Sequence, residues 1–114
     1  MSKLYQVRLT WAADRDLTRL RALSGRAGAA LKRLKTDPRA GHTLTGALQG
    51  ARALEFSMPG GQYRAAYAIQ EDVPKQDDPD ETESICLAFM VGPHENFYRE
   101  AERRLKALRG SGEV

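Results

Sequence analysis

The sequence predicts an α+β fold in which helices and strands are grouped along the chain, and three observations lead to this prediction. An alternating segment near the N-terminus is followed by two stretches with apolar residues at helical spacing. Further segments then read as strands separated by turn residues, and the chain closes with another helical pattern. The predicted order is β-α-α-β-β-β-α, with an antiparallel sheet packed against an N-terminal helical hairpin.

The N-terminal part is predicted to form one strand and two helices. Residues 4–9 (LYQVRL) alternate between two faces, as a half-buried strand does. Thr10 can cap the helix that follows, because its hydroxyl can accept a backbone N–H of the first turn. Gly25 interrupts this helix, and a second helix ends before Pro38, since the residue preceding proline avoids helical backbone angles. The apolar positions are Ala13, Leu17 and Leu20 in the first helix and Ala27, Leu31 and Leu34 in the second.

The middle of the chain is predicted to form a loop and a hairpin. Residues 39–50 are interrupted by glycines and are expected to be a loop. A strand over residues 51–57 leads into a tight turn, in which Pro59 fixes one φ angle and Gly60 supplies a positive φ. The chain returns as a strand over residues 62–69, whose side chains alternate between the two faces.

The C-terminal part combines a strongly acidic segment with apolar and basic ones. Residues 71–83 hold seven acids, one lysine and two prolines, and we expect a mobile acidic loop there. Residues 84–91 are apolar on both faces, which predicts a central strand. A last helix is predicted from near Glu95 to about Arg109. The rest of the chain carries 17 bases against 8 acids, which fits either a face that binds a polyanion or ordinary solvated helix faces.

Length and composition narrow the class of protein. The 114 residues fit a single domain spanning 1–114. No apolar run approaches the ~20 residues of a membrane span, and the N-terminus lacks a signal-peptide core, so we expect a cytoplasmic protein. Cys86 lies in an apolar run and is expected to be a buried, inert thiol. The two histidines and one cysteine lack metal-ligand spacing, so no metal or other cofactor is expected.

Short motifs follow one another along nearly the whole chain. They are Tyr5-x-Val7, Ala13-x-x-Asp16-Leu17-x-x-Leu20, Asp37-Pro38, Gly41-His42-x-Leu44-x-Gly46-x-Leu48, Arg52-x-Leu54, Gly61-Gln62-Tyr63-Arg64-x-x-Tyr67 and Val91-Gly92-Pro93-His94-Glu95-x-Phe97-Tyr98. In this order and at these spacings, the set resembles the RelE/ParE superfamily of toxins from type II toxin–antitoxin systems. The resemblance implies a RelE-like fold.

The same resemblance implies partners and an activity. A cognate antitoxin would hold such a toxin in check. Some members of the superfamily cut mRNA in the ribosomal A site, whereas ParE-like members poison DNA gyrase and cut nothing. We therefore expect a ribosome-dependent mRNA endonuclease that acts without a metal. The alternatives are a ParE-like gyrase inhibitor without catalysis and a degenerate, non-toxic member of the family.

Metal-free RNA cleavage needs a base for the 2′-hydroxyl, an acid for the leaving oxygen and cations for the phosphate. Arg64 matches the family arginine that holds the scissile phosphate, and it lies on the strand face opposite Tyr63 and Tyr67. Its alternative is a surface arginine paired with Glu55. His94 stands where related RNA-cutting toxins place a basic residue or histidine, and it can act as acid or base. Its alternative is a helix-start residue that bonds to the backbone.

Further candidates are expected to hold the RNA. Tyr98 can stack on a base or assist proton transfer, or it can belong to the core, because Phe97 and Tyr98 cannot both face fully inward. Arg52 can contact an RNA phosphate, and His42, in the loop, is the weaker histidine candidate. Glu55 departs from the RNA-cutting prototype, which has lysines along this strand. Glu55 can serve as a general base in the RNA site, as carboxylates do in some relatives, or it can mark a loss of activity.

Overall fold

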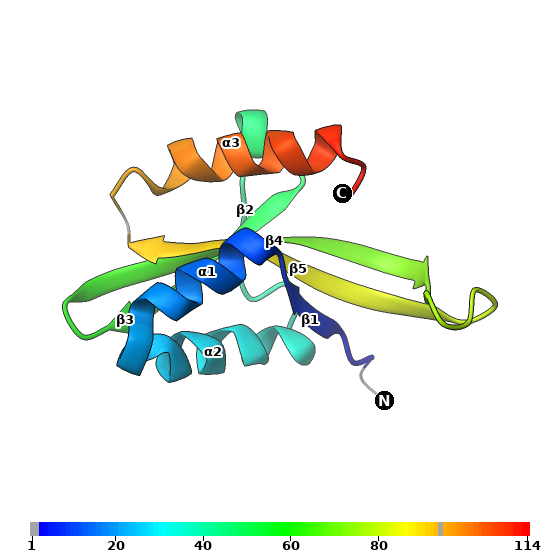
Figure 1. The fold of residues 1–114 in the computed structure, drawn as a ribbon, viewed down its shortest axis with the longest axis horizontal. Helices are drawn as coiled ribbons and strands as arrows, with labels where there is room; N and C mark the ends of the chain where they lie inside the picture. The colour runs from blue at the N-terminus through cyan, green and yellow to red at the C-terminus, as the bar shows by residue number, and fades with distance from the viewer. Residues whose placement is uncertain (1–2, 94) are drawn as a thin grey trace.

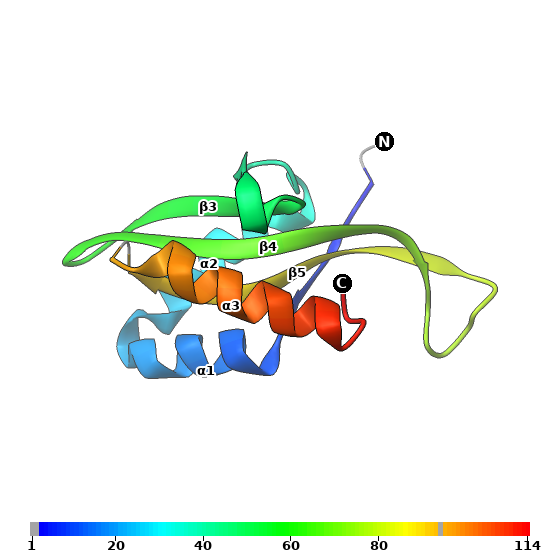
Figure 2. The ribbon, with the colours of Figure 1, turned by 90° about the horizontal axis from the view of Figure 1, so that it is seen from above.

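The computed structural model, which describes residues 3–93 and 95–114, has three layers with a central sheet between helices (Figure 1). The elements are β1 (Gln6–Leu9), α1 (Trp11–Leu20), α2 (Ser24–Lys32), β2 (His42–Thr43), β3 (Ala51–Met58), β4 (Gly61–Pro74), β5 (Thr82–Pro93) and α3 (Phe97–Gly110), with short 3-10 turns at Arg21–Leu23, Arg33–Lys35 and Gly46–Leu48. The α1–α2 hairpin covers one face of the sheet and α3 covers the other (Figures 1 and 2), which confirms the predicted α+β class. Within the described ranges, none of the helices has the length and apolar character to cross a membrane.

The sheet is mixed, because the predicted antiparallel sheet is extended by a parallel strand. Its five strands lie in the order β1-β5-β4-β3-β2. Strands β3, β4 and β5 form the predicted antiparallel meander. Strand β1 instead pairs with β5 in parallel, because the long intervening chain supplies the crossover that a parallel pair requires. The expected loop over residues 39–50 also contains β2, whose two residues pair with Ala53 and Arg52 of β3.

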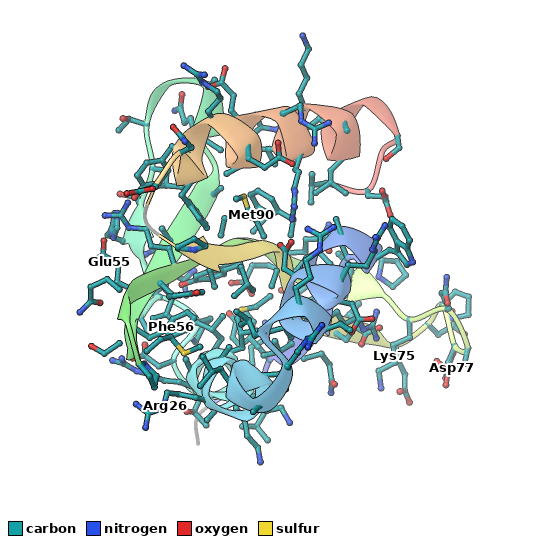
Figure 3. The ribbon with its side chains drawn as sticks, turned by 60° about the vertical axis from the view of Figure 1, so that its left-hand side comes forward. Arg26, Glu55, Phe56, Lys75, Asp77 and Met90 are labelled. Atoms are coloured by element: carbon teal, nitrogen blue, oxygen red, sulfur yellow. The ribbon has the colours of Figure 1, made fainter. Side chains whose placement is uncertain are left out.

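A β-bulge lets β5 serve two cores at once. Met90 and Ala88 pair with consecutive residues of β4, so Phe89 is an extra residue between them. Phe89 and Met90 consequently both enter the core beneath α3, while Ala88 enters the core beneath the α1–α2 hairpin. Figure 3 shows Met90 between the sheet and α3, and Phe56 on the side of the hairpin. The two cores explain why β5 is apolar on both faces, and the bulge explains why the consecutive residues Phe89 and Met90 enter the same core.

Cys86 lies on β5 in the core beneath the helical hairpin and has no exposed surface, which confirms the expected buried thiol. Burial raises the pKa of the thiol to about 11. A thiol with this pKa stays protonated near neutral pH and is a poor nucleophile.

A buried carboxylate, Asp16 of α1, joins this helix to the sheet and to α3. Its Oδ2 accepts the backbone N–H of Val91 at 2.9 Å. The guanidinium of Arg104 on α3 donates to both carboxylate oxygens, at 2.6 and 3.1 Å. Strand β1 ends opposite Ala88, so the Val91 N–H lies beyond the last β1 partner and Asp16 supplies its acceptor. One side chain thereby satisfies a strand N–H and a largely buried arginine.

Glu100 on α3 is expected to make stability depend on pH in the acid range. Its hydrogen bonds with Arg103 and then Arg104 lower the pKa of the carboxyl from 4.5 to about 2. Because the pKa is lower in the folded state, the stabilisation is complete above 4.5 and is lost as pH falls toward about 2. We expect Glu100→Gln to flatten this part of the curve only modestly, because the carboxylate is 32% exposed. Urea unfolding at several pH values tests this, with Glu102→Gln on the same helix as control. An unchanged curve would contradict it.

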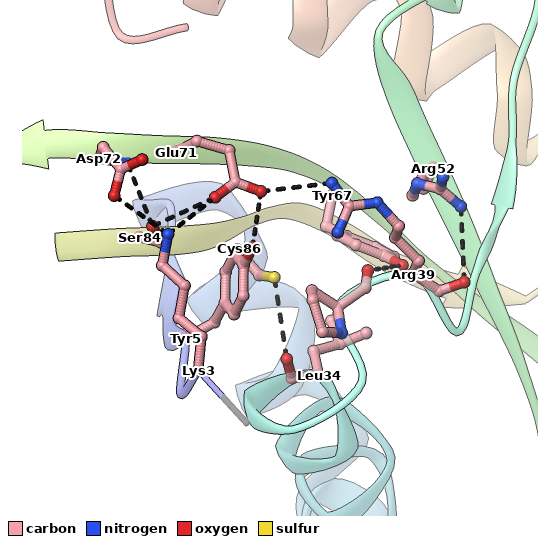
Figure 4. Close-up of polar contacts among 11 residues, drawn as sticks. Lys3, Tyr5, Leu34, Arg39, Arg52, Tyr67, Glu71, Asp72, Ser84 and Cys86 are labelled. Carbon is pink, nitrogen blue, oxygen red and sulfur yellow. Dashed lines mark hydrogen bonds and ion pairs between the residues drawn. The ribbon is translucent and has the colours of Figure 1, made fainter. Parts of the chain in front are cut away.

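The hairpin of β4 and β5 extends well beyond the body of the sheet (Figures 1 and 2). Glu71 connects the end of this hairpin that is nearest the body of the sheet to the rest of the protein (Figure 4). The carboxylate accepts hydrogen bonds from the hydroxyls of Tyr5 at 2.6 Å and Ser84 at 3.3 Å, and it forms ion pairs with Lys3 and Arg39. The hydrogen bond from Tyr5 is the main reason that the pKa of Glu71 lies below its usual value.

The acidic loop is shorter than the predicted range of 71–83. Strand β4 continues to Pro74 and β5 begins at Thr82, and these two residues are paired. The local acids do not prevent strand pairing, because basic side chains neutralise several of them; Lys75, for example, forms an ion pair with Glu81 at 3.1 Å. The loop proper is therefore 75–81, and its mobility stays a prediction.

Shortening this loop is expected to leave the fold intact. Replacing residues 76–80 with Asn-Gly would join Lys75 to Glu81 through a two-residue hairpin turn. We expect the free energy of unfolding to change by less than about 1 kcal/mol, because loop-closure entropy depends weakly on length. Chemical denaturation measures this change, and Glu71→Ala provides a destabilising comparison. Loss of the folded state in the shortened chain would show that the loop is structural.

Candidate functional site

Arg64 is held on the α3 side of the sheet by a carboxylate on the neighbouring strand. Its neighbours on β4, Tyr63 and Ala65, pack toward the helical hairpin, so the alternation of β4 directs Arg64 to the other face, as predicted. Glu55 of β3 stands directly opposite Arg64 in the antiparallel register. The Nε of Arg64 donates to Glu55 Oε1 at 2.8 Å. The arginine side chain is only 14% exposed, whereas that of Glu55 is 48% exposed.

Tyr98 on α3 covers the guanidinium of Arg64. The distance from Arg64 Cζ to the centroid of the Tyr98 ring is 4.9 Å, within the range of a cation–π interaction. Phe97 is 1% exposed and packs in the core beneath α3. Its ring meets that of Tyr98 edge to face, with centroids 5.6 Å apart. The two aromatic residues therefore divide their roles, since Phe97 anchors the helix and the half-buried Tyr98 faces the arginine.

One buried nitrogen of Arg64 lacks a hydrogen-bond partner in the part of the chain that the structure describes. Its Nη1 is buried and has no hydrogen-bond partner among residues 3–93 and 95–114. A buried charged donor without an acceptor costs free energy, and a catalytic role or a bound ion or water is among the explanations for such a group. Glu55, Arg64 and Tyr98 thus combine a half-exposed carboxylate, a cation with spare hydrogen-bonding capacity and an aromatic ring. In the described ranges, no three His, Cys, Asp or Glu side chains are grouped as metal ligands.

Arg52 does not join this cluster. It lies three residues before Glu55 on β3 and therefore points to the opposite face of the sheet. Its Nη1 donates to the carbonyl oxygen of Gly41 at 2.6 Å and that of Arg39 at 3.5 Å (Figure 4). The predicted contact of Arg52 with an RNA phosphate therefore stays a prediction, and it would be made on the face of the sheet opposite Arg64. The guanidinium instead ties the loop before β2 to the sheet.

His94, the predicted proton-transfer residue, lies outside the described residues. The structure describes its neighbour in the chain, Pro93, which ends β5 and pairs with Tyr63 of β4. The role of His94 therefore stays a prediction from the resemblance.

A shallow cavity of about 450 Å³, open to solvent and with His42 and Glu102 exposed at its rim, adjoins Tyr98 between β2 and α3. His42 of β2, the segment that follows β2, and Tyr98 and Glu102 of α3 line it. Sequence reasoning gave Glu102 no role and made His42 only a weak candidate. The spacing of Tyr98 and Glu102, four residues apart on one helix face, is the signal that could have linked them.

Comparison with known structures gives the class of protein that this fold defines. The chain is similar to the toxin–antitoxin complex RelBE2 from Mycobacterium tuberculosis, with 23% identity, a TM-score of 0.54 and coverage of 80% of this chain and 99% of that one. It is also similar to a mutant of the Escherichia coli toxin RelE in the free state, with 16% identity, a TM-score of 0.60 and coverage of 92% and 98%. At these identities the likeness shows a RelE-type fold and nothing finer.

The family is shown by the sequence match. The model of the ParE-like toxins of type II bacterial toxin–antitoxin systems matches residues 10–102, and the chain belongs to this family. No curated protein matches the chain. The match includes Glu55, Arg64 and Tyr98, and it confirms the resemblance inferred from the sequence motifs.

Proposed function

We propose that this toxin cleaves ribosome-bound mRNA without a metal, at the site formed by Glu55, Arg64 and Tyr98. The observation that carries the proposal is the state of Arg64. Glu55 orients its guanidinium through Nε and Tyr98 covers it, while the buried Nη1 has no partner among the described residues. A phosphate oxygen supplies the acceptor that this donor lacks, and arginine binds phosphate strongly.

The proposed reaction is a transesterification within the RNA chain. A base removes the proton of the 2′-hydroxyl, the 2′-oxygen attacks the adjacent phosphorus, and the bond from phosphorus to the 5′-oxygen breaks. Protonation of that oxygen leaves a 5′-hydroxyl and a 2′,3′-cyclic phosphate. Glu55 is the proposed base, because it is half-exposed beside Arg64. His94 is the proposed acid, and Arg64 stabilises the charge that grows on the phosphate.

A second candidate function is inhibition of DNA gyrase by binding alone. Two observations favour it. Arg52 lies on the opposite face of the sheet from Arg64, and Glu55 neutralises part of the charge of Arg64. The described residues therefore concentrate fewer cations at the site than a strong RNA-binding cleft would. A gyrase inhibitor needs a docking surface and no proton-transfer groups.

Primer extension on mRNA from cells that express the chain distinguishes the two functions, when paired with a supercoiling assay on purified gyrase. Cuts within codons together with normal supercoiling are the expected result. Intact mRNA together with inhibited supercoiling would reject mRNA cleavage and support inhibition of gyrase.

A cognate antitoxin is the proposed protein partner, and Trp11 marks a place where it can bind. Trp11 is 73% exposed and lines a groove of about 390 Å³ between α1 and α3, together with Phe89 and Leu108. Arg15 lies over its ring at 4.7 Å, and the groove is lined by apolar side chains together with Arg104 and Glu113, so it suits an amphipathic segment that carries both apolar and charged side chains.

Antitoxin binding is expected to change the environment of Trp11 and to stabilise the toxin. Trp11 is the sole tryptophan, so its fluorescence reports on this groove. Titration with the protein encoded beside the toxin should shift the emission to the blue. It should also stabilise the fold by about 3 kcal/mol at a free concentration a hundredfold above Kd. A stabilising complex with unchanged emission would place the antitoxin elsewhere.

A further inference from the structure

Tyr98 connects the Arg64 site to the cavity between β2 and α3. The guanidinium of Arg64 lies 4.9 Å from the centroid of the tyrosine ring. The same tyrosine lines the cavity of about 450 Å³. The phosphate and the base of one nucleotide lie on either side of its ribose. A nucleotide whose phosphate meets Arg64 can therefore extend its base past Tyr98 toward the cavity.

The cavity lining suits a nucleobase. A protein that recognises an unpaired base provides apolar or aromatic contacts for the faces of the ring and hydrogen-bonding groups for its edge. Leu44 and the ring of Tyr98, both half-buried, provide the first kind of contact, and Leu48, which packs in the core beneath α3, forms the floor. The hydrogen-bonding groups that line the cavity are those of His42, Thr43, Thr45 and Glu102.

Glu102 determines which base fits. An ionised carboxylate only accepts hydrogen bonds, and its two oxygens can take two adjacent donors. Guanine presents such a pair on one edge, the N1–H and the exocyclic amino group. Uracil presents a single N–H between two carbonyl oxygens, which a carboxylate repels. We propose that the cavity formed by His42, Tyr98 and Glu102 is a nucleobase subsite that prefers guanine over uracil. The inference rests on the proposed RNA-cleaving function and adds to it the identity of the base beside the scissile phosphate.

Titration of the ¹⁵N-labelled full chain with GMP, AMP, CMP and UMP tests the subsite by NMR. We expect GMP to shift the amide signals of residues 42–48 and 98–102. We expect GMP to bind at least about fivefold more tightly than UMP, the discrimination that a two-donor contact typically supplies. Glu102→Gln should bring the two affinities within about twofold of each other, because an amide offers a donor as well as an acceptor. Asp77→Asn, at the far end of the hairpin (Figure 3), is the matched control and should behave as the wild type.

Three results would overturn the subsite. These are equal affinities for GMP and UMP, amide shifts confined to the strands around Arg64, and the absence of shifts at millimolar nucleotide. Each is separable from a failure of the proposed function. If mRNA is cut through Arg64 but Glu102→Gln leaves the base preference at the cut unchanged, the subsite falls and the nuclease stands. If mRNA stays intact while GMP binds as described, the proposed nuclease activity is rejected and the proposed nucleobase subsite is retained.

Discussion

Replacing Asp16 with alanine is expected to lower the free energy of unfolding by about 3–5 kcal/mol, the usual cost of removing one partner of a buried ion pair. Arg104 would keep its hydrogen bonds to Glu100 and to the carbonyl of Phe89. It would lose its hydrogen bonds to both carboxylate oxygens of Asp16. The N–H of Val91 would lose its acceptor as well. Domains of this size are stable by only about 5–15 kcal/mol, so this change would remove a large part of the total.

Urea denaturation of three variants tests the Asp16 prediction. Asp16→Asn keeps an acceptor for the Val91 N–H and should cost less than Asp16→Ala. In Asp16→Ala/Arg104→Met the stranded charge is gone, so part of the stability should return. A loss below about 1 kcal/mol in Asp16→Ala would equal an ordinary hydrogen bond and would contradict the central role of this ion pair.

Arg64→Ala is expected to slow mRNA cleavage on the order of 10²- to 10³-fold, because the arginine meets charge that grows in the transition state. Loss of the acid at His94 should cost about 10²- to 10⁴-fold in His94→Ala. Both variants should therefore fail to arrest growth. Arg64→Lys keeps the charge but loses the planar fork that binds two oxygens, and we expect only partial rescue.

Growth curves after induction measure these effects, and antitoxin binding by each purified variant serves as the control for folding. Glu55→Gln separates the two interpretations of Glu55. If Glu55 is the base, cleavage falls although the side chain keeps its size. Toxicity that survives both Arg64→Ala and His94→Ala would exclude a catalytic mechanism at this site.

Much of the fold follows from local patterns in the sequence. The cap at Thr10 is observed, with its hydroxyl accepting the N–H of Ala13 at 3.1 Å. The two helices of the hairpin, the turn after Met58 and the meander of β3, β4 and β5 also lie close to the predicted ranges. These features depend on apolar spacing and turn residues, which are properties of short segments.

The features that the sequence did not predict depend on contacts between distant segments. The parallel pairing of β1 with β5 joins residues about eighty positions apart, and the burial of Asp16 depends on Arg104. The extension of β4 through the acidic segment depends on Glu71 and its partners. Charge density alone wrongly suggested a loop there.

In the candidate site, too, some features follow from local sequence patterns and others depend on contacts between distant segments. Strand alternation correctly placed Arg64 on the face opposite Tyr63 and Tyr67, and the pairing with Glu55 that was the alternative to a functional role is observed. The same rule, applied to β3, separates Arg52 from Glu55, because the two are an odd number of residues apart. The predicted phosphate contact of Arg52 therefore lies on the other face of the sheet from Glu55, and it stays a prediction. The cavity at His42 and Glu102 brings together β2 and α3, and no local pattern indicates that contact.

Single-turnover cleavage of ribosome-bound mRNA by the purified chain tests the central claim most directly. We expect a cut within the codon in the A site, a 2′,3′-cyclic phosphate on the upstream fragment, and a rate at least about 10²-fold lower for Arg64→Ala. Intact mRNA with the wild-type chain, at concentrations that inhibit supercoiling by purified gyrase, would contradict it.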